Sequence, residues 1–232
     1  MTDLYLIPAL LADDTLQNVL PHDVIKIIHG LEHFIVEDIR TARRFISKTG
    51  HPKKIEQLNF RELNEHTPNS ELSNLLPFIL QADTGVMSEA GVPGVADPGA
   101  SIVRLAHANN INVIPLVGPS SILMALMASG LNGQSFAFAG YLPVKKQERQ
   151  ERLRALEKIS AKEHQTQIFI ETPYRNMQLL EDILMCCRLS TMLTIAADIT
   201  GKTEFISTRS IKQWKTDLPN LHKRPAVFLI QA

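Results

Sequence analysis

The chain has 232 residues, 24 basic and 24 acidic side chains, a formal net charge of zero and a hydrophobic content of 44%. This composition excludes a disordered chain and a global charge that would draw the protein to nucleic acid or a membrane surface. The longest apolar stretch, residues 121–131, falls short of the roughly 20 residues that span a bilayer. Cys186 and Cys187 are adjacent and have no further cysteine to pair with, and the N-terminus carries acids where a signal peptide would carry bases. We therefore expect a cytoplasmic protein that does not span a membrane.

Strand-like and helix-like runs alternate along the first half of the chain. Strands are predicted at residues 4–8, 33–38, 55–60, 84–88 and 111–117. Helices are predicted at residues 40–50, 69–82 and 99–110. Alternation of this kind predicts a parallel sheet covered by helices.

The second half ends in strands with little helix between them. Strands are predicted at residues 135–143, 166–171, 191–197, 203–208 and 225–231. Helices are predicted at residues 122–130, 145–164, 174–187 and 210–216. We predict an α/β fold of two domains, 1–117 and 118–232, with a mainly parallel sheet in the first and a mixed sheet in the second.

A loop rich in glycine and proline, MSEAGVPGVADPGAS, begins at the end of the predicted strand 84–88. In open α/β sheets, ligands bind outside the carboxyl ends of the strands, and glycines let the backbone approach them closely. The carboxylates of Glu89 and Asp97 suit a ribose hydroxyl or a cationic ligand better than a phosphate. A long surface turn is the alternative interpretation.

A second loop, Gly118-Pro119-Ser120-Ser121, opens the predicted helix 122–130. Unpaired N–H groups and two hydroxyls at a helix start offer hydrogen bonds to a ligand, although a plain capped helix has the same composition. The phosphate-binding patterns GxGxxG and GxxxxGK[ST] are both missing from the sequence.

Three stretches in order, SEAGVPGVADPG, INVIPLVGPSSILMALMASGL and FAFAGYLPVKKQER, resemble the tetrapyrrole methylase superfamily of S-adenosylmethionine-dependent methyltransferases. The stretches LYLIP, VEDIRTARRFI, FIETPYR and DITGKTE extend this resemblance over most of the chain. It is closest to the branch that methylates a cytidine ribose 2′-oxygen in 16S ribosomal RNA. The resemblance implies two α/β domains, S-adenosylmethionine in a cleft between them, and a homodimer.

The same resemblance implies which residues contact the cofactor. They are Leu10, Leu11, Glu89, Val92, Ser120, Ser121, Ile122, Met177, Ala197 and Ala226.

The chain also departs from the ribosomal branch. The first loop, PALLADD, has no glycine between Pro8 and Asp14, Gly201 stands where a lysine is typical, and Arg224 and Pro225 replace a Gly-Glu pair. These departures leave open a methyltransferase acting on ribosomal RNA, one acting on a tetrapyrrole or other small molecule, or a cofactor-binding module without catalysis.

Two basic stretches are candidates for contact with RNA of the small ribosomal subunit. Arg40, Arg43 and Arg44 belong to a segment without acids and share one face of a helix, and Lys145 and Lys146 open a second basic group that also contains Arg149 and Arg152. Basic patches bind RNA through its phosphates, whereas the alternative is a solvated helix face. We expect no base-stacking platform, because the aromatic residues near these patches are only Phe45 and Tyr141.

A ribose 2′-hydroxyl is a weak nucleophile, so a group that removes its proton would assist methyl transfer. Asp38 and Glu171 are the preferred candidates because each follows a predicted strand, with Glu37 and Lys145 behind them. The alternative roles are a helix cap for Asp38 and an ion pair with Arg175 for Glu171.

We expect no metal site. His29, His33 and Glu37 have the spacing of ligands on one helix face, but the predicted helix ends near Gly30 and His33 begins a strand.

Overall fold

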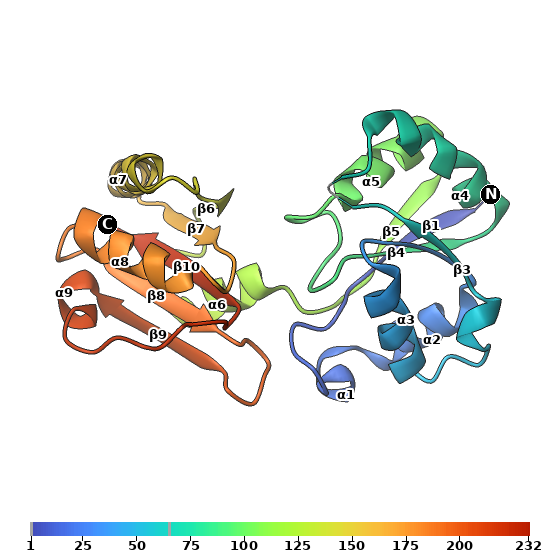
Figure 1. The fold of residues 1–232 in the computed structure, drawn as a ribbon, viewed down its shortest axis with the longest axis horizontal. Helices are drawn as coiled ribbons and strands as arrows, with labels where there is room; N and C mark the ends of the chain where they lie inside the picture. Colours follow the sequence, from blue (N-terminus) through green and yellow to red (C-terminus); the bar gives the residue numbers. More distant parts are fainter. Residues whose placement is uncertain (1, 65) are drawn as a thin grey trace. The chain divides into compact units, whose positions relative to one another are not determined.

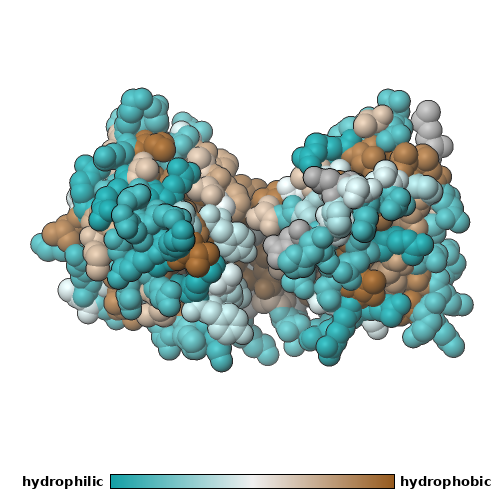
Figure 2. Space-filling model, turned by 45° about the horizontal axis from the view of Figure 1, so that its top comes forward, coloured by the Kyte–Doolittle hydropathy of each residue, from teal (hydrophilic) through white to brown (hydrophobic). Residues whose placement is uncertain are grey.

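The computed structural model describes residues 2–64 and 66–232, and the chain divides into two compact units, Met1–Ser120 and Ser121–Ala232 (Figure 1). Each unit has its own sheet and its own apolar core. Hydrophilic side chains cover most of the face of each unit that Figure 2 presents. Among the described helices, none combines the length and the apolar character that a membrane crossing requires.

The first unit is built on a five-stranded sheet in the order β3-β2-β4-β1-β5. Its strands are β1 (Asp3–Ile7), β2 (His33–Val36), β3 (Asn59–Glu62), β4 (Thr84–Met87) and β5 (Asn112–Pro115). Every neighbouring pair is parallel, which confirms the predicted parallel sheet. All residues of β2 and β4 are buried, as expected for central strands covered on both faces.

The helices of the first unit lie in two layers around this sheet (Figure 1). They are α1 (Leu16–Val19), α2 (His22–Gly30), α3 (Ile39–Lys48), η1 (Ile55–Gln57), η2 (Asn69–Leu75), α4 (Leu76–Gln81) and α5 (Gly99–Ala108). Phe34 packs into the core with α2 and α3, whereas its neighbour Ile35 packs with α4 and α5 on the other face. The two helix layers cover the two faces of the sheet. The loops that follow the strands lie at an edge of the sheet, where neither layer covers them.

Two predicted elements of the first unit have different bounds in the structure. The predicted strand 55–60 is wrong at its start: residues 55–57 form η1, a 3₁₀ turn in which the Lys54 amide donates to the Gln57 side chain at 3.1 Å. The predicted helix 69–82 begins as the 3₁₀ segment η2 and becomes α-helical only at Leu76. Pro77 explains this limit, because proline lacks an N–H and fits an α-helix only in its first turn.

The second unit has a five-stranded sheet in the order β6-β7-β10-β8-β9. Its elements are α6 (Ser121–Ser129), β6 (Phe136–Tyr141), α7 (Lys146–Glu163), β7 (Thr166–Ile170), α8 (Asn176–Cys186), β8 (Met192–Ala197), β9 (Phe205–Ser210), α9 (Ile211–Trp214) and β10 (Ala226–Gln231). Strands β6 and β7 are parallel and the other pairs are antiparallel, which confirms the predicted mixed sheet. Helices α7 and α8 bury Leu153 and Leu180 against Phe169 and Phe228. Ser129 of α6 accepts a hydrogen bond from Thr208 of β9.

Candidate active site

A cavity of about 280 Å³ opens in the first unit at the carboxyl ends of β1, β2 and β4. It is lined by residues 9–13, 36–38, 41, 42, 44, 45, 48 and 87–90. The loops after three parallel strands meet here because parallel strands end at the same edge of a sheet, and this is the position where α/β folds bind ligands.

Four carboxylates line this cavity, from Asp13, Glu37, Asp38 and Glu89. Asp38 is the N-cap of α3, and its Oδ1 accepts from the Thr41 amide at 2.6 Å. That hydrogen bond lowers the pKa of Asp38, so its carboxylate stays charged and is a weak proton acceptor. Glu37 Oε2 accepts from the Glu89 amide at 3.3 Å, which joins the loop after β2 to the loop after β4.

Arg44 and Lys48 bring two positive charges to the same cavity. Asp13 Oδ1 lies 3.2 Å from Arg44 Nη2 and 3.2 Å from Lys48 Nζ, and Asp14 lies 3.5 Å from Lys48. The hydrogen bond from Lys48 lowers the pKa of Asp13. The acids of the first loop therefore neutralise part of the basic segment 40–54, a pairing between distant residues that the local sequence did not reveal.

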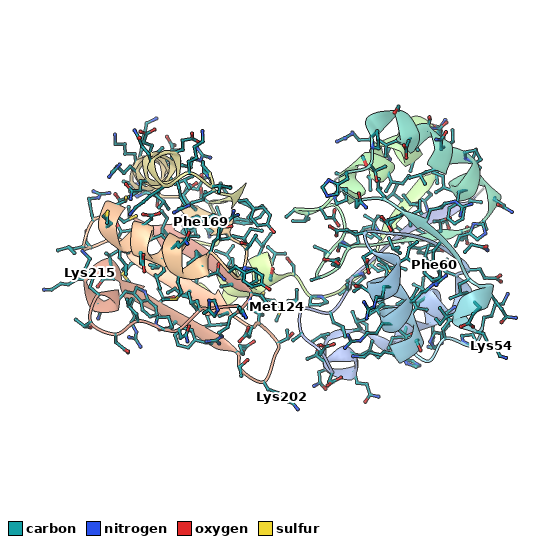
Figure 3. All side chains as sticks on the ribbon, viewed as in Figure 1. Lys54, Phe60, Met124, Phe169, Lys202 and Lys215 are labelled. Atoms are coloured by element: carbon teal, nitrogen blue, oxygen red, sulfur yellow. The ribbon has the colours of Figure 1, made fainter. Side chains whose placement is uncertain are left out.

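The other cations of this basic segment have different partners. The Arg43 guanidinium lies 5.2 Å from the ring centroid of Phe60, which Figure 3 labels, and Lys53 pairs with Glu32. Arg40 is exposed. The three arginines predicted on one helix face thus differ, since among the described residues an acid pairs with Arg44 and none pairs with Arg40 or Arg43.

The glycine-rich loop meets the first loop through its backbone. The Ala9 amide donates to the Gly91 carbonyl at 2.7 Å, and the Gly91 amide donates back at 3.2 Å. Gly91 has a φ of +76°, which few other residues adopt, and a Cβ at Gly118 would lie 2.2 Å from Pro8. The sequence predicts that glycines let the backbone approach a ligand closely. In the structure Gly91 and Gly118 instead let neighbouring segments approach the first loop closely, and this contact fixes its path.

The two acids of the glycine-rich loop have different environments. Asp97 is half-buried, and its Oδ1 accepts from the amides of Gly94 at 2.6 Å and Gly99 at 2.9 Å. Burial raises the pKa of Asp97, and the two amide donors act in the opposite direction. Asp97 therefore closes the loop, whereas Glu89 is exposed and belongs to the cavity.

Glu171, the other predicted catalytic acid, lies in the second unit, and its side chain is completely buried. Its Oε1 accepts from Arg175 Nη2 at 2.6 Å and from the Thr172 amide at 2.7 Å. The ion pair considered as the alternative is thus formed. In this structure the Glu171 carboxylate lies away from solvent and holds the turn after β7, and its catalytic role stays a prediction.

One residue of the second predicted basic group, Arg149, does not lie at the surface. Arg149 is buried, its Nε donates to Asp182 at 2.7 Å, and its Nη1 donates to the Val144 carbonyl at 2.7 Å. Arg149 therefore stabilises the start of α7, and its side chain is not at the surface where the basic group was predicted. Lys145 and Lys146 remain exposed, with Lys145 paired to a glutamate of the same helix.

The residues that the family resemblance assigns to the cofactor fall into two groups, one in each unit. In the first unit Leu10, Leu11 and Glu89 line the cavity, whereas Val92 and Ser120 are outside its lining.

In the second unit Ser121 and Ile122 open α6. Ala197 and Ala226 face each other on β8 and β10, and Met177 packs against the core to which both alanines belong. The structure describes each group inside its own unit.

No family model matches the chain. It is 30% identical over 199 residues to the ribosomal RNA small subunit methyltransferase I of Haemophilus influenzae, with 84% of this chain and 67% of the relative covered. The methyltransferase CobJ superposes with a TM-score of 0.65 at 15% identity, covering 100% of this chain and 94% of CobJ. The cobalt precorrin-4 methyltransferase CbiF gives 0.62 at 15% identity, covering 99% and 94%. The fold is thus that of the methyltransferases CobJ and CbiF, and the similarity to the Haemophilus influenzae protein establishes that the chain belongs to the ribosomal RNA small subunit methyltransferase I family.

Proposed function

We propose that the protein transfers a methyl group from S-adenosylmethionine to a ribose 2′-hydroxyl of a cytidine in 16S ribosomal RNA. One observation carries the proposal beyond family membership: the cavity at the carboxyl ends of β1, β2 and β4 combines carboxylates with cations. A ribose needs acceptors for its hydroxyls, and the adjoining phosphates need positive charge. Both kinds of group line this one cavity.

The donor set also suits the proposed cofactor. S-adenosylmethionine carries a positive sulfonium and two ribose hydroxyls, which the carboxylates of Glu37 and Glu89 complement. When bound, it would supply the activated methyl group. Leu10 and Leu11 would contact its apolar parts. Ala197 and Ala226 of the second unit are assigned to the cofactor by the family resemblance alone.

The protein's own contribution is to orient the hydroxyl. Asp38 would accept a hydrogen bond from the 2′-hydroxyl and direct its oxygen, because the Thr41 amide and α3 fix the carboxylate. Its lowered pKa favours this orienting role over proton removal. Arg44 and Lys48 would pair with phosphates beside the target nucleotide once Asp13 releases them. Alignment of this kind is the main requirement of an in-line displacement.

Exchange of Asp38 for asparagine tests this role. Asp38→Asn keeps the shape of the side chain and an oxygen for the Thr41 amide, so α3 stays capped. We expect turnover to fall about tenfold or more, because a misplacement of the reacting group by about 1 Å can cost about 10²-fold, while cofactor affinity changes little. Wild-type turnover in Asp38→Asn would remove this residue from the mechanism.

The proposed function is tested by methyl transfer from radiolabelled S-adenosylmethionine. Small ribosomal subunits, a mixture of precorrins and a reaction without acceptor form three arms, and labelled RNA is digested to nucleosides. We expect the label in 2′-O-methylcytidine. Label in the precorrins alone would show a small-molecule methyltransferase, and cofactor binding by calorimetry without transfer would show a non-catalytic module.

The family resemblance also supports a homodimer, which we include in the proposal. Analytical ultracentrifugation of the intact chain tests it, and a monomer at the concentrations used for methyl transfer would contradict it.

A further inference from the structure

Three loops meet at one end of the second unit's sheet. They comprise residues 171–175 after β7, 198–204 after β8 and 217–225 before β10. Because β10 is antiparallel to β7 and β8, its first residue lies beside their last ones. The Lys223 amide donates to the Pro173 carbonyl at 3.1 Å, so the first and third loops are joined through their backbones.

This loop cluster holds several strained and unsatisfied groups. Asp198, Thr200 and Lys223 have φ values of 50°, 70° and 61°, in the left-handed region that side chains other than glycine seldom adopt. The described residues contain four buried side-chain atoms without a hydrogen-bond partner, and all lie in or beside these loops: Glu171 Oε2, Arg175 Nε, Asn176 Oδ1 and Thr200 Oγ1. Strain and unpaired polar groups concentrate at functional sites.

Tyr174 stands on this cluster as an exposed aromatic residue, with 70% of its surface accessible. Its turn is closed by a hydrogen bond from the Arg175 amide to the Thr172 carbonyl at 2.9 Å. The buried Glu171 carboxylate binds both ends of the same turn. The backbone that carries the ring is therefore fixed before any ligand binds, which lowers the entropy cost of stacking.

Lys223 adds positive charge over one face of this ring. Its Nζ lies 6.0 Å from the ring centroid of Tyr174, and the side chain is exposed. Among the described residues no carboxylate pairs with Lys223 or with Lys202, which Figure 3 shows on the loop after β8. Arg175 and Arg224, in contrast, are each paired with an acid. The cations that these loops offer to a ligand are thus two ammonium groups, and the exposed Glu204 carboxylate, which accepts from the Thr200 amide at 2.7 Å, belongs to the same loops.

We propose that Tyr174 and Lys223 form a stacking site for one unpaired nucleotide of the RNA substrate, with the base on the ring and its phosphate at the ammonium group. Single-stranded RNA is bound by this combination of an aromatic face and a nearby cation, without regard to sequence. Bases in a duplex are already stacked and do not reach the ring. The inference rests on the proposed action on RNA, and it adds a substrate contact in the second unit.

Fluorescence anisotropy with a labelled single-stranded RNA oligonucleotide tests the ring. Tyr174→Ala should raise the Kd about 5- to 150-fold, the range that base–aromatic stacking predicts, and Tyr174→Phe should bind as wild type. Tyr174→Ala should leave the Kd for the same sequence in duplex form at the wild-type value. Phe136→Ala is the matched control, because Phe136 is also exposed but pairs with Thr166 at the opposite end of β7.

The salt dependence of binding tests the cation. Lys223→Gln should reduce the slope of log K against log salt concentration by about 0.7, the value for one phosphate contact on a single strand. Lys215→Gln is the control, because Lys215 is an exposed lysine directly after α9, outside the three loops, and Figure 3 shows it at the other end of the second unit from Lys202. An unchanged slope in Lys223→Gln would remove the phosphate contact.

The outcomes separate this inference from the proposed function. If the wild type binds RNA and methylates small ribosomal subunits, but Tyr174→Ala binds the single strand normally, only the stacking site is refuted. If Tyr174→Ala weakens cofactor binding in calorimetry and leaves RNA binding intact, the ring contacts the cofactor and the inference is wrong. If the wild type neither binds nor methylates RNA, the proposed function fails and the stacking site fails with it.

Discussion

Replacing Asp13 by asparagine should strengthen RNA binding. In the structure this carboxylate pairs with both Arg44 and Lys48, the two cations that line the cavity of the first unit. A phosphate that binds either cation must first displace Asp13. Asp13→Asn removes the competing charge and leaves both cations available.

The size of the effect follows from the exposure of these pairs. The side chains of Asp13 and Arg44 are 73% and 66% exposed, and Lys48 is 34% exposed. Exposed ion pairs contribute about 0.2–1 kcal/mol each, so release of two costs about 0.4–2 kcal/mol. The Kd for RNA should therefore fall about 2- to 30-fold in Asp13→Asn. The free energy of unfolding should drop by no more than the same amount.

The assay is titration of labelled single-stranded RNA at about 0.1 M salt, where charges within about 10 Å still interact. Asp23→Asn is the matched control, because Asp23 is an exposed acid paired with Lys26 at 2.9 Å and its loss changes the net charge equally. Equal Kd values for the two variants would show a general charge effect and refute the competition. Tighter binding that persists when Arg44 and Lys48 are both replaced by glutamine would refute it as well.

Three further changes test the structural assignments. Asp97→Asn should remove a pH dependence of the stability. Burial raises the pKa of Asp97 in the folded state. The free energy of unfolding of the wild type, measured in urea, should therefore fall relative to that of the variant as pH rises from about 4 through the raised pKa. Arg149→Met should destabilise the second unit by about 3–5 kcal/mol in urea unfolding, because it leaves Asp182 buried and charged, and Arg149→Met with Asp182→Leu should recover much of the loss. Gly118→Ala should lower the free energy of unfolding by about 1–3 kcal/mol, because the added Cβ would collide with Pro8. Unfolding curves identical to wild type would contradict each assignment.

Periodicity was sufficient to predict the elements whose burial pattern is simple. The strands at Thr84–Met87 and His33–Val36 are apolar and buried on both faces, so their sequence signal is continuous. The bounds at 55–60 and 69–82 were missed because short-range hydrogen bonds and Pro77 decide between 3₁₀, α and strand there. Such local competition does not change the hydrophobic pattern on which the prediction depended.

The site was less predictable because it depends on contacts between distant residues. Asp38 could be assigned from its place after a strand, but the hydrogen bond that lowers its pKa is seen only in the structure. Arg149 was grouped with its neighbours because Asp182, 33 positions along the chain, gave no local signal. The exposure of Tyr174 could not be predicted, because it lies outside the basic stretches and the local sequence does not show which way its ring faces.

The first loop shows how this chain differs from its family without losing the site. Its route does not depend on a glycine of its own, since the Ala9–Gly91 bridge and the fit of Pro8 against Gly118 fix the backbone from the neighbouring loops. What the altered loop changes is the lining of the cavity, because Leu10 and Leu11 bring apolar side chains to it. The neighbouring loops keep the backbone path of the first loop while its side chains change the surface of the cavity. We therefore expect the departure from the family sequence to act on which ligand the cavity accepts and to leave the path of the loop intact.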